Sequence, residues 1–571
     1  MIPRIWISEI EFSDNSKVKF SKNDITVFVG PNNAGKSAAL KESATLLHQK
    51  TNKTIVVKDI TIDKSGDEES LFSLLDSLSK KTIREGHTEP FYQGFGYSFY
   101  QPSTKHYWAN YQNGLGELVS VFVNTLTTER RLESANPPPS NKLTTQPPTH
   151  PIHFLQKYDE QEKKFSDYFR QAFGTDLIVH RNAGNEVPLY VGEKPILREG
   201  EDRVSEGYLV NLEKLDLLHL QGDGMRSFVG VLLNAFISKH SIIFIDEPEA
   251  FLHPPQARLI GKMLAKDLPS ERQLFLATHS EDFLKGLLDA DNSNLKIIRI
   301  QRDNKINRVS VLDNSDIITI WNDSLLRHSN ILNGLFHSKV IICESDSDCR
   351  FYSAVLSAIH EGTNLISPDL LFIHCGGKHR IPTVVKSLVK LNVIMRVVTD
   401  FDILNDVNPL KEIYEELGGI WEDIESDWKI VKLSIDQKRP EKESKELKKE
   451  IDAIFDSITE KILPKTKISE IQNLLKKASA WASAKEVGKS FVPSGDQTRA
   501  YERIESKLRE KGLHLVEVGQ LESFVKSIGN HGPKWVNEVM TKDLKSDPEL
   551  EAAREFVQRV ISDRAEVANK L

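Results

Sequence analysis

The strongest constraint on this chain is one short loop near its start, Gly30–Ser37, which reads GPNNAGKS. The loop follows an apolar run over 25–29 and precedes a stretch of good helix formers over 38–44. A glycine-bounded loop between a buried strand and a helix, ending in Lys-Ser, is the pattern that holds nucleotide phosphates. The helix N-terminus adds its positive dipole end to the inward-facing backbone N–H groups. The loop therefore predicts nucleotide binding.

Two side chains at the end of this loop have distinct chemical roles in that prediction. Lys36 can reach the β- and γ-phosphates, and the Ser37 hydroxyl can bind Mg²⁺. Gly30 and Gly35 allow the backbone to turn around the phosphates. The predicted ATP-binding residues of the loop are Gly30, Asn32, Asn33, Gly35, Lys36 and Ser37.

Two further apolar runs end in polar residues that suit the same chemistry. Residues 242–245 are followed by Asp246 and Glu247, and residues 273–276 are followed shortly by His279. Buried strands bring such side chains to the carboxyl edge of an α/β sheet, where ligands bind. Asp246 would hold Mg²⁺ and Glu247 would polarise the attacking water as a general base. A lone histidine is more often a core or capping residue, but its position after a matching strand favours a role beside the phosphates.

Length and composition indicate a soluble protein of several domains. A chain of 571 residues is too long for one core, so we expect two or three domains. The net charge is −7, so nucleic-acid binding would have to use local basic patches. The three cysteines, Cys343, Cys349 and Cys375, form no Cys-x-x-Cys pair, which favours a reducing cytosol. We expect no signal peptide and no membrane span, and hence a cytoplasmic protein.

A second group of acidic residues follows a new series of predicted strands. The predicted strands are 340–343, 371–375 and 393–398, each followed by polar residues and the first two by predicted helices. Strand–helix repeats of this length predict a parallel sheet, with Glu344, Gly376-Gly377, Asp400 and Asp402 along one edge. An isolated Asp-x-Asp is more typical of a cap or turn. Three acids at strand ends instead favour a Mg²⁺ or Mn²⁺ site able to hydrolyse a phosphodiester.

The last part of the chain has a different sequence pattern from the strand–helix repeats before it. Residues 436–511 predict two or three amphipathic helices. Their Lys-rich face could contact a nucleic-acid backbone, but a solvated surface is the default interpretation. Residues 513–522 read as a late strand that ends in Glu522.

Residues 1–320 resemble the ATP-binding-cassette (ABC) ATPases of the chromosome-maintenance and DNA-repair type. Gly30–Ser37 matches the Walker A loop, and 242–247 matches Walker B with its catalytic glutamate. Residues 220–226 correspond in position to the signature motif of these ATPases, residues 252–254 correspond to the D-loop, and His279 corresponds to the switch histidine.

This resemblance implies a homodimer in which the signature of one head caps the phosphates bound by the other. Gly222 and Gly224 would then bind ATP in the partner head. Gln221 replaces the usual serine, which argues against fast hydrolysis but not against nucleotide binding.

The acids after residue 339 resemble those of a Toprim domain, the metal-dependent module of topoisomerases, primases and some nucleases. Glu344 matches the lone glutamate, Asp348 the second acid of a Glu-Gly-x-x-Asp variant, and Asp400 and Asp402 the Asp-x-Asp motif. Ser345 replaces the glycine.

An ABC-type head followed by Toprim resembles the OLD (overcoming lysogenisation defect) nucleases, which include bacterial anti-phage effectors. In that family a late Leu-Glu has a metal-site role, which points to Glu522. A nearby lysine stabilises the transition state there; Lys534 is our candidate, with Lys526 as its competitor.

These arguments predict an α/β protein with an N-terminal ABC-type ATPase head and a C-terminal Toprim domain. We expect the head over 1–325, a linker over 326–338, and the Toprim nuclease domain over 339–571, with 436–511 as a helical insertion. The predicted catalytic residues are Glu247, His279, Glu344, Asp400, Asp402 and Lys534. The predicted metal ligands are Ser37, Asp246, Glu344, Asp348, Asp400, Asp402 and Glu522.

The predicted function is an ATP-regulated, metal-dependent endonuclease acting on DNA, with ATP and Mg²⁺ or Mn²⁺ as cofactors. One alternative is the same nuclease acting on RNA such as tRNA; another is a non-catalytic, ATP-switched sensor or assembly protein. A topoisomerase is disfavoured because no region suggests its tyrosine nucleophile domain, and a primase because template-binding modules are lacking. Expected partners are the nucleic acid, a second copy or a higher oligomer, and a regulatory protein or RNA–DNA element.

Overall fold

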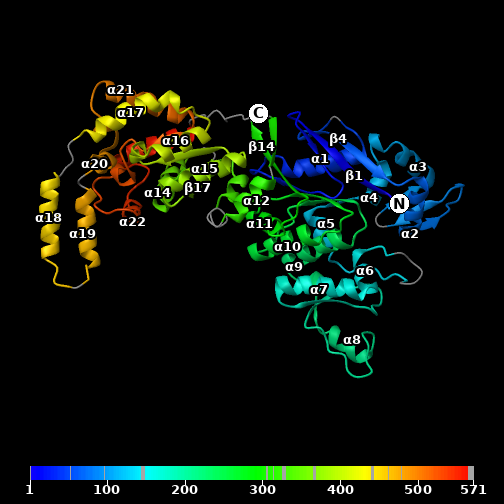
Figure 1. Cartoon of the computed structure of the whole chain (residues 1–571). Helices are drawn as coiled ribbons and strands as arrows, with labels where there is room; N and C mark the ends of the chain where they lie inside the picture. Colours follow the sequence, from blue (N-terminus) through cyan, green and yellow to red (C-terminus); the bar gives the residue numbers. More distant parts are fainter. Residues whose placement is uncertain are drawn as a thin grey trace. The chain divides into compact units, whose positions relative to one another are not determined.

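The computed structural model divides into two compact units, residues 1–321 and 322–571, whose helices and strands are labelled in Figure 1. The structure describes residues 2–51, 53–94, 97–142, 148–303, 306–312, 314–323, 330–363, 368–438, 443–460, 462–476 and 479–562. Within the predicted linker, residues 326–329 lie outside the described ones.

The first unit is organised around a mixed sheet, which has six strands in the described residues. In spatial order they are β15 (Ile306–Leu312), β14 (Leu295–Asp303), β3 (Ile25–Val29), β13 (Gln273–Ala277), β12 (Ile242–Asp246) and β8 (Val123–Leu126). Strand β15 is antiparallel to β14, and the other neighbours are parallel. Every residue of β3 and β13 is buried, as expected for parallel strands covered on both faces.

Helix α1 (Lys36–His48) lies between this sheet and an antiparallel sheet of β2 (Lys17–Lys19), β1 (Arg4–Phe12) and β4 (Val57–Ser65). One hydrophobic core joins all three layers and includes Ile7, Leu40 and Phe28. Phe275 stacks on Phe28 and on Phe244, with ring centroids 6.5 and 5.2 Å apart. The packed layers hold the carboxyl ends of β3, β12 and β13 at one edge.

Other helices and small sheets surround this core. The helices are α2 (Glu68–Leu78), α3 (Gln101–Ala109), α4 (Val119–Phe122), α5 (Thr128–Glu133), α6 (Pro151–Lys157), α7 (Asp159–Phe173), α8 (Glu206–Leu212), α9 (Asp223–Leu232), α10 (Pro254–Asp267), α11 (Glu281–Leu288) and α12 (Asn314–Asn322). The small sheets contain β5 (Lys80–Thr82), β6 (Phe91–Gly94) and β7 (Tyr97–Tyr100), and β9 (Asp176–Val179), β10 (Leu189–Gly192) and β11 (Asp216–Leu217). In Figure 1, α8 lies beyond α7, away from the large sheet.

The second unit contains a parallel sheet, four-stranded in the described residues. Its order is β17 (Leu370–His374), β16 (Lys339–Cys343), β18 (Met395–Thr399) and β19 (Leu513–Leu515). Cys343 pairs with His374, and Thr399 pairs with Leu515, so the strands end at a common edge. The predicted parallel arrangement of the first three strands is confirmed.

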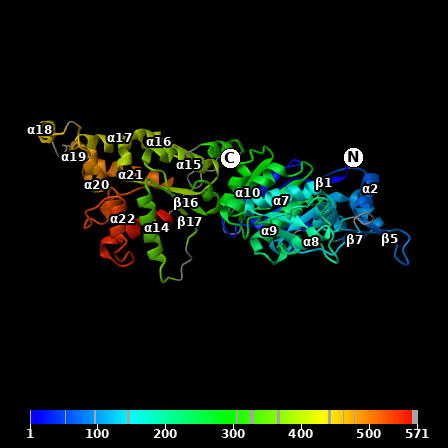
Figure 2. The same ribbon diagram turned by 90° about the horizontal axis from the view of Figure 1, so that it is seen from below.

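Helices cover this sheet and extend from it. They are α14 (Asp346–His360), α15 (Ile381–Lys390), α16 (Val407–Glu416), α17 (Glu422–Asp436), α18 (Ser444–Asp456), α19 (Lys465–Lys476), α20 (Ala480–Val487), α21 (Asp496–Glu510), α22 (Pro533–Val539) and α23 (Glu551–Ser562). Phe351, Trp535 and Phe524 form part of an aromatic core under α14. Figures 1 and 2 both show α18 and α19 extending as a hairpin from the rest of this unit.

The helices between β18 and β19 begin earlier than the predicted insertion over 436–511. Helices α16 and α17 already lie between these strands, before residue 437. Helix α20 returns to the loop after β18, because it packs on the 3₁₀ turn Phe401–Asn405. One inserted helix, α20, therefore packs at the edge of the sheet, where its Lys485 contacts Asp400.

The strand predicted over 513–522 is wrong in its second half. Strand β19 ends at Leu515, and Glu522 lies in the 3₁₀ turn Leu521–Phe524. The cause is the turn that follows directly, in which the Gly519 N–H donates to the Val516 carbonyl oxygen at 2.8 Å and Gly519 has a φ of 115°. The carbonyl of Gly519 accepts the Phe401 N–H at 2.8 Å, which binds this turn to the loop after β18.

The α/β class predicted from the sequence is confirmed in both units. Each has a parallel or mostly parallel sheet with helices packed on it, and the apolar runs read as strands supply the central strands. None of the helices formed by the described residues combines the length and the apolar character needed to cross a bilayer.

Candidate functional site

The loop between β3 and α1 requires glycine at both ends. Gly30 has a φ of 147°, and a Cβ there would lie 2.0 Å from the Ile300 carbonyl oxygen. Gly35 has a φ of 101°, and a Cβ there would lie 2.8 Å from Val56 Cγ2. The positive φ at both positions disfavours larger residues, and at Gly30 the nearby backbone leaves no room for a side chain. The glycine pattern predicted from the sequence thus matches the conformation that a phosphate-binding loop needs.

Lys36 and Ser37 start α1 and point back toward the loop and the sheet edge. The Lys36 Nζ donates to the carbonyl oxygens of Gly30 and Pro31 at 2.8 and 2.9 Å. The Ser37 hydroxyl donates to Asp246 Oδ1 at 2.8 Å, so α1 and β12 meet here. Burial raises the pKa of Asp246, so a bound cation would stabilise its ionised form. A hydroxyl beside a carboxylate is the ligand pair used for nucleotide-bound Mg²⁺.

Glu247 and His279, predicted from different strands, lie together. His279 Nδ1 is 3.3 Å from Glu247 Oε1. The backbone of Glu247 is left-handed, with φ of 49°, and its N–H donates to the Ala277 carbonyl oxygen at the end of β13. This conformation turns the side chain beside His279. Both side chains are about half exposed and are free to meet a bound nucleotide.

Arg131 supports this arrangement and was missed in the sequence. Its side chain is fully buried, and Nη1 donates to the carbonyl oxygens of Glu247 at 2.7 Å and Asp246 at 3.3 Å. Desolvation lowers the pKa of Arg131, while the nearby acids Glu249, Glu247 and Asp246 oppose this. An arginine after β8 gives no sequence signal for such a role. Its position is set by the pairing of β8 with β12.

Glu249 is a second acid beside His279 that sequence reasoning did not select. It is 6% exposed, and its Oε1 accepts the Thr278 hydroxyl at 2.6 Å and the His279 N–H at 3.2 Å. The same oxygen lies 3.6 Å from His279 Nδ1. Burial raises the pKa of Glu249. His279 is therefore bracketed by Glu247 and Glu249, and the usable signal was the acid spacing of the Asp-Glu-Pro-Glu stretch.

We predict that Glu249→Gln slows ATP hydrolysis about tenfold while the KM for ATP changes less than about twofold. The amide keeps the shape but removes the charge beside His279, and one hydrogen bond to a charged group is worth about 1.5 kcal/mol. Steady-state phosphate release measures both constants. Glu160→Gln, at an exposed position of α7, is the control. An unchanged kcat, or a loss confined to KM, would contradict the positioning role.

The two signature glycines lie on a different element from the loop. Gly222 is the N-cap of α9, and Gly224 lies in its first turn. A Cβ at Gly224 would lie 2.8 Å from the Phe251 carbonyl oxygen, so this glycine allows α9 to pack on the segment after β12. Their contact with ATP in a partner head stays a prediction.

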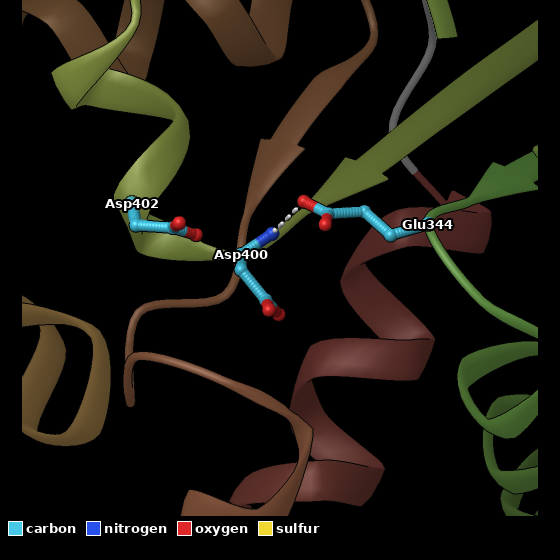
Figure 3. A group of neighbouring side chains, drawn as sticks. All are labelled: Glu344, Asp400 and Asp402. Atoms are coloured by element: carbon cyan, nitrogen blue, oxygen red, sulfur yellow. Dashed lines mark hydrogen bonds between the residues drawn. The ribbon is translucent and has the colours of Figure 1, made fainter. Parts of the chain in front are cut away.

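The second site lies at the carboxyl edge of the β16–β18 sheet. Glu344 follows β16, Asp400 follows β18, and Asp402 lies in the next 3₁₀ turn. One ligand oxygen from each lies within 4.8 Å of the other two. The Asp400 N–H donates to Glu344 Oε1 at 3.0 Å. Figure 3 shows Glu344 and Asp402 approaching Asp400 from opposite sides.

The donors of this carboxylate cluster fit a hard divalent cation. Burial raises the pKa of Glu344, and burial followed by the charge of Glu344 raises the pKa of Asp400. For these two partly buried acids the cost of burial outweighs the attraction of Lys485, so the ionised forms lack full compensation. Carboxylate oxygens without nitrogen or sulfur are ligands that Mg²⁺ and Mn²⁺ prefer. Glu344, Asp400 and Asp402 thus lie together and form a candidate cation site.

Among the described residues, two lysines contact this cluster, and neither was predicted as a site residue. Lys485 on α20 lies 2.8 Å from Asp400 Oδ2 and 3.3 Å from Asp402 Oδ1. Lys378 lies 2.7 Å from both Asp402 Oδ2 and Asp406 Oδ2. Burial opposes ionisation of Asp402, but the two lysines outweigh it and lower its pKa.

The two lysines suggested by the sequence are exposed. Lys534 is exposed on α22, and Lys526 is exposed after the turn that holds Glu522. A catalytic role for Lys534 stays a prediction. Of the two lysines on the cluster, Lys485 contacts two of its acids; it lies on α20, within the predicted helical insertion, and carried no motif.

Asp348 and Glu522, the other predicted metal ligands, are held by backbone groups. Asp348 Oδ2 accepts the N–H and the hydroxyl of Ser345 at 2.8 and 2.9 Å, which caps α14. Burial raises the pKa of Asp348, and the nearby Glu522 adds to this effect. Glu522 Oε1 accepts the Gly532 N–H at 2.7 Å. The two acids are thus electrostatic neighbours beside the cluster, and their metal binding stays a prediction.

Two family models match the chain. Residues 120–284 match the family described as "AAA domain, putative AbiEii toxin, Type IV TA system", and this range contains Asp246, Glu247 and His279. Residues 335–402 match "Overcoming lysogenization defect protein-like, TOPRIM domain", and this range contains Glu344, Asp400 and Asp402. No curated protein matches.

Solved structures of Smc head domains also match. One is the SmcHead bound to the C-winged helix domain of ScpA, with 14% identity, 55% of this chain and 99% of that chain covered, and a TM-score of 0.33. The SMC head domain from Thermotoga maritima matches with 12% identity, 55% and 100% coverage, and a TM-score of 0.29. The Smc head domain derived from Pyrococcus furiosus matches with 12% identity, 56% and 99% coverage, and a TM-score of 0.32.

Proposed function

Because this chain belongs to the OLD-type proteins that join an ATPase domain to a Toprim domain, we propose that it is an ATP-regulated, divalent-metal-dependent endonuclease acting on DNA. The observation that carries the proposal is the carboxylate cluster. Its three acids come from the ends of two adjacent strands and the turn that follows, and their oxygens lie within 4.8 Å of one another. Lys378 and Lys485 offset only part of this negative charge, and three partly buried acids at one sheet edge are costly unless a cation joins them.

The residues at the cluster would have different roles in phosphodiester hydrolysis. Glu344, Asp400 and Asp402 would hold the cation, and the hydrogen bond from the Asp400 N–H orients the Glu344 carboxylate. The bound cation would stabilise the charge that develops on the phosphate oxygens. Lys378 stays close to Asp402 and keeps that carboxylate ionised and oriented.

At the ATPase site, ATP is the substrate. Lys36 would exchange the carbonyl oxygens of Gly30 and Pro31 for phosphate oxygens, and the loop N–H groups would bind the same phosphates. Glu247 would accept a proton from the attacking water, with His279 beside it. The family resemblance supports head-to-head dimerisation on ATP and a role in anti-phage defence.

The test is cleavage of nucleic acid by the full chain. Supercoiled plasmid and, separately, tRNA are incubated with Mg²⁺ or Mn²⁺, with and without ATP. We expect the plasmid to be cut and Glu344→Gln to lose at least about a hundredfold in rate, because even second-shell partners of metal ligands are worth about ten- to a hundredfold. Glu412→Gln, exposed on α16, is the matched control.

Three outcomes separate the alternatives. Cleavage of plasmid that depends on Glu344 supports the proposal. Cleavage of tRNA alone moves the substrate to RNA. A protein inert on both, with ATP hydrolysis intact, would overturn the nuclease and favour an ATP-switched assembly protein.

A further inference from the structure

We infer that Lys485 is the resident counterion of the carboxylate cluster, and that a divalent cation binds there only by displacing its ammonium group from Asp400 and Asp402. The inference rests on the proposed function, because it concerns the same cluster. It adds that the Lys485 ammonium group and the divalent cation compete for the same carboxylates. This competition lowers the affinity for the cation, and cation binding exposes the Lys485 side chain.

The first argument is the overlap of ligand atoms. The Lys485 Nζ lies 2.8 Å from Asp400 Oδ2 and 3.3 Å from Asp402 Oδ1. These are two of the carboxylates that the cation would share with Glu344. A cation bound at about 2.1 Å from such an oxygen would come close to the ammonium group. Two positive groups at that separation in a buried site repel strongly, so one must leave.

The second argument is that the backbone of Lys485 cannot move away. The backbone around Lys485 packs closely against two glycines. A Cβ at Gly519 would lie 2.2 Å from the Lys485 carbonyl oxygen, and a Cβ at Gly488 would lie 2.1 Å from the Glu517 carbonyl oxygen. The Gly519 carbonyl in turn accepts the N–H of Phe401, which lies between the two aspartates. Moving α20 would therefore disturb the loop that carries the cluster. Displacement has to occur by rotation of the side chain.

The third argument is that the side chain has somewhere to go. The Lys485 side chain is 33% exposed, whereas Asp400 and Asp402 are 16% and 17% exposed. A lysine has four flexible methylene groups and a strongly hydrated head, so it can turn into solvent at low cost. After rotation, the ammonium would lie at the rim of the cluster.

Lys378 provides an internal comparison. It is also close to Asp402, but its second partner is Asp406, which lies outside the cluster. Its side chain is 17% exposed, about half the value for Lys485. Lys378 therefore has a partner to retain when a cation binds, whereas the ion pairs of Lys485 among the described residues are with acids of the cluster. Only Lys485 is expected to compete with the cation.

The test is direct Mn²⁺ binding, measured by electron paramagnetic resonance on the full chain without nucleic acid. Lys485→Met should bind Mn²⁺ about tenfold more tightly than the wild type, since loss of one close charge changes such equilibria by about that factor or more. Lys378→Met should bind Mn²⁺ within about threefold of the wild type, because the charge it removes is shared with Asp406. Equal or weaker binding by Lys485→Met would overturn the inference.

A second measurement applies to the unmodified protein. An amine-reactive reagent followed by mass spectrometry should label Lys485 more strongly with Mn²⁺ than without it, while labelling of Lys378 stays the same. Labelling of Lys485 that ignores Mn²⁺ would overturn the inference even if the variant failed to fold. Mn²⁺-dependent exposure in a protein that cuts no nucleic acid would leave the inference standing and reject the nuclease. Plasmid cleavage together with Lys485 labelling that does not depend on Mn²⁺ would support the nuclease and overturn the inference.

Discussion

Asp400→Asn is expected to abolish phosphodiester cleavage and, at the same time, to raise the melting temperature of the protein. Asparagine keeps the size of the side chain but cannot supply the anionic oxygen that the cation needs. Cleavage should fall by at least about a hundredfold, because removing a ligand exceeds the effect of removing its support. A plasmid assay with Mn²⁺ measures this loss.

The gain in stability follows from the burial of the charge. Burial and the neighbouring Glu344 raise the pKa of Asp400, although Lys485 opposes them. A carboxyl whose pKa is raised on folding contributes most to stability at low pH, where it is protonated in both states. That contribution is lost as pH rises from the ordinary carboxyl range through the raised pKa. Asparagine stays neutral throughout, so its advantage over Asp400 should grow as pH rises above the ordinary Asp pKa of about 4.

Asp402→Asn is the matched comparison. Lys485 and Lys378 outweigh burial and lower the pKa of Asp402, so here the ionised form is favoured by folding. The ionised Asp402 therefore stabilises the folded protein at pH values above the ordinary pKa of a carboxyl group. This stabilisation is lost as pH falls through the lowered pKa.

The asparagine variant at Asp402 should therefore be inactive and less stable at pH 8. Thermal unfolding in a metal chelator measures both variants, at about 2–4 °C per kcal/mol for a domain of this size. Equal destabilisation by the two substitutions would contradict the assigned charges.

Apolar runs predicted the sheet edges because parallel strands are buried on both faces. The strand over 25–29 is buried at every residue, and the acids after β16 and β18 lie where that pattern predicts. Such a signal is local, since the residues of one strand and its terminal acid are adjacent in the chain. The pattern can therefore be recognised without knowing which strands pair in the folded chain.

Residues that act through long-range contacts were not predictable in this way. Lys485 is 85 residues from Asp400 along the chain, and its α20 reads as one more amphipathic helix. Arg131 contacts Glu247 only because β8 pairs with β12. The turn at Gly519 ended a predicted strand because its carbonyl bonds to Phe401. In each case the determining contact joins elements that no sequence window contains.

Lys36→Ala is expected to remove ATP binding and, with it, every effect of ATP on cleavage. The Lys36 ammonium donates to the Gly30 and Pro31 carbonyl oxygens, so it is already held above the loop where phosphates would lie. Two hydrogen bonds to charged phosphate oxygens are worth about 3–5 kcal/mol, which corresponds to a loss of about a hundredfold or more in affinity. Equilibrium dialysis with labelled ATP measures it.

The same variant tests whether the two sites are coupled. Mn²⁺ binding at the carboxylate cluster should stay unchanged, because Lys36 belongs to the first unit and the cluster to the second. Plasmid cleavage by Lys36→Ala should match that of the wild type without ATP, and adding ATP should not alter it. Lys22→Ala, at an exposed position before β3, controls for loss of a surface charge. If ATP still changed cleavage by Lys36→Ala, regulation would have to act through a nucleotide site other than this loop.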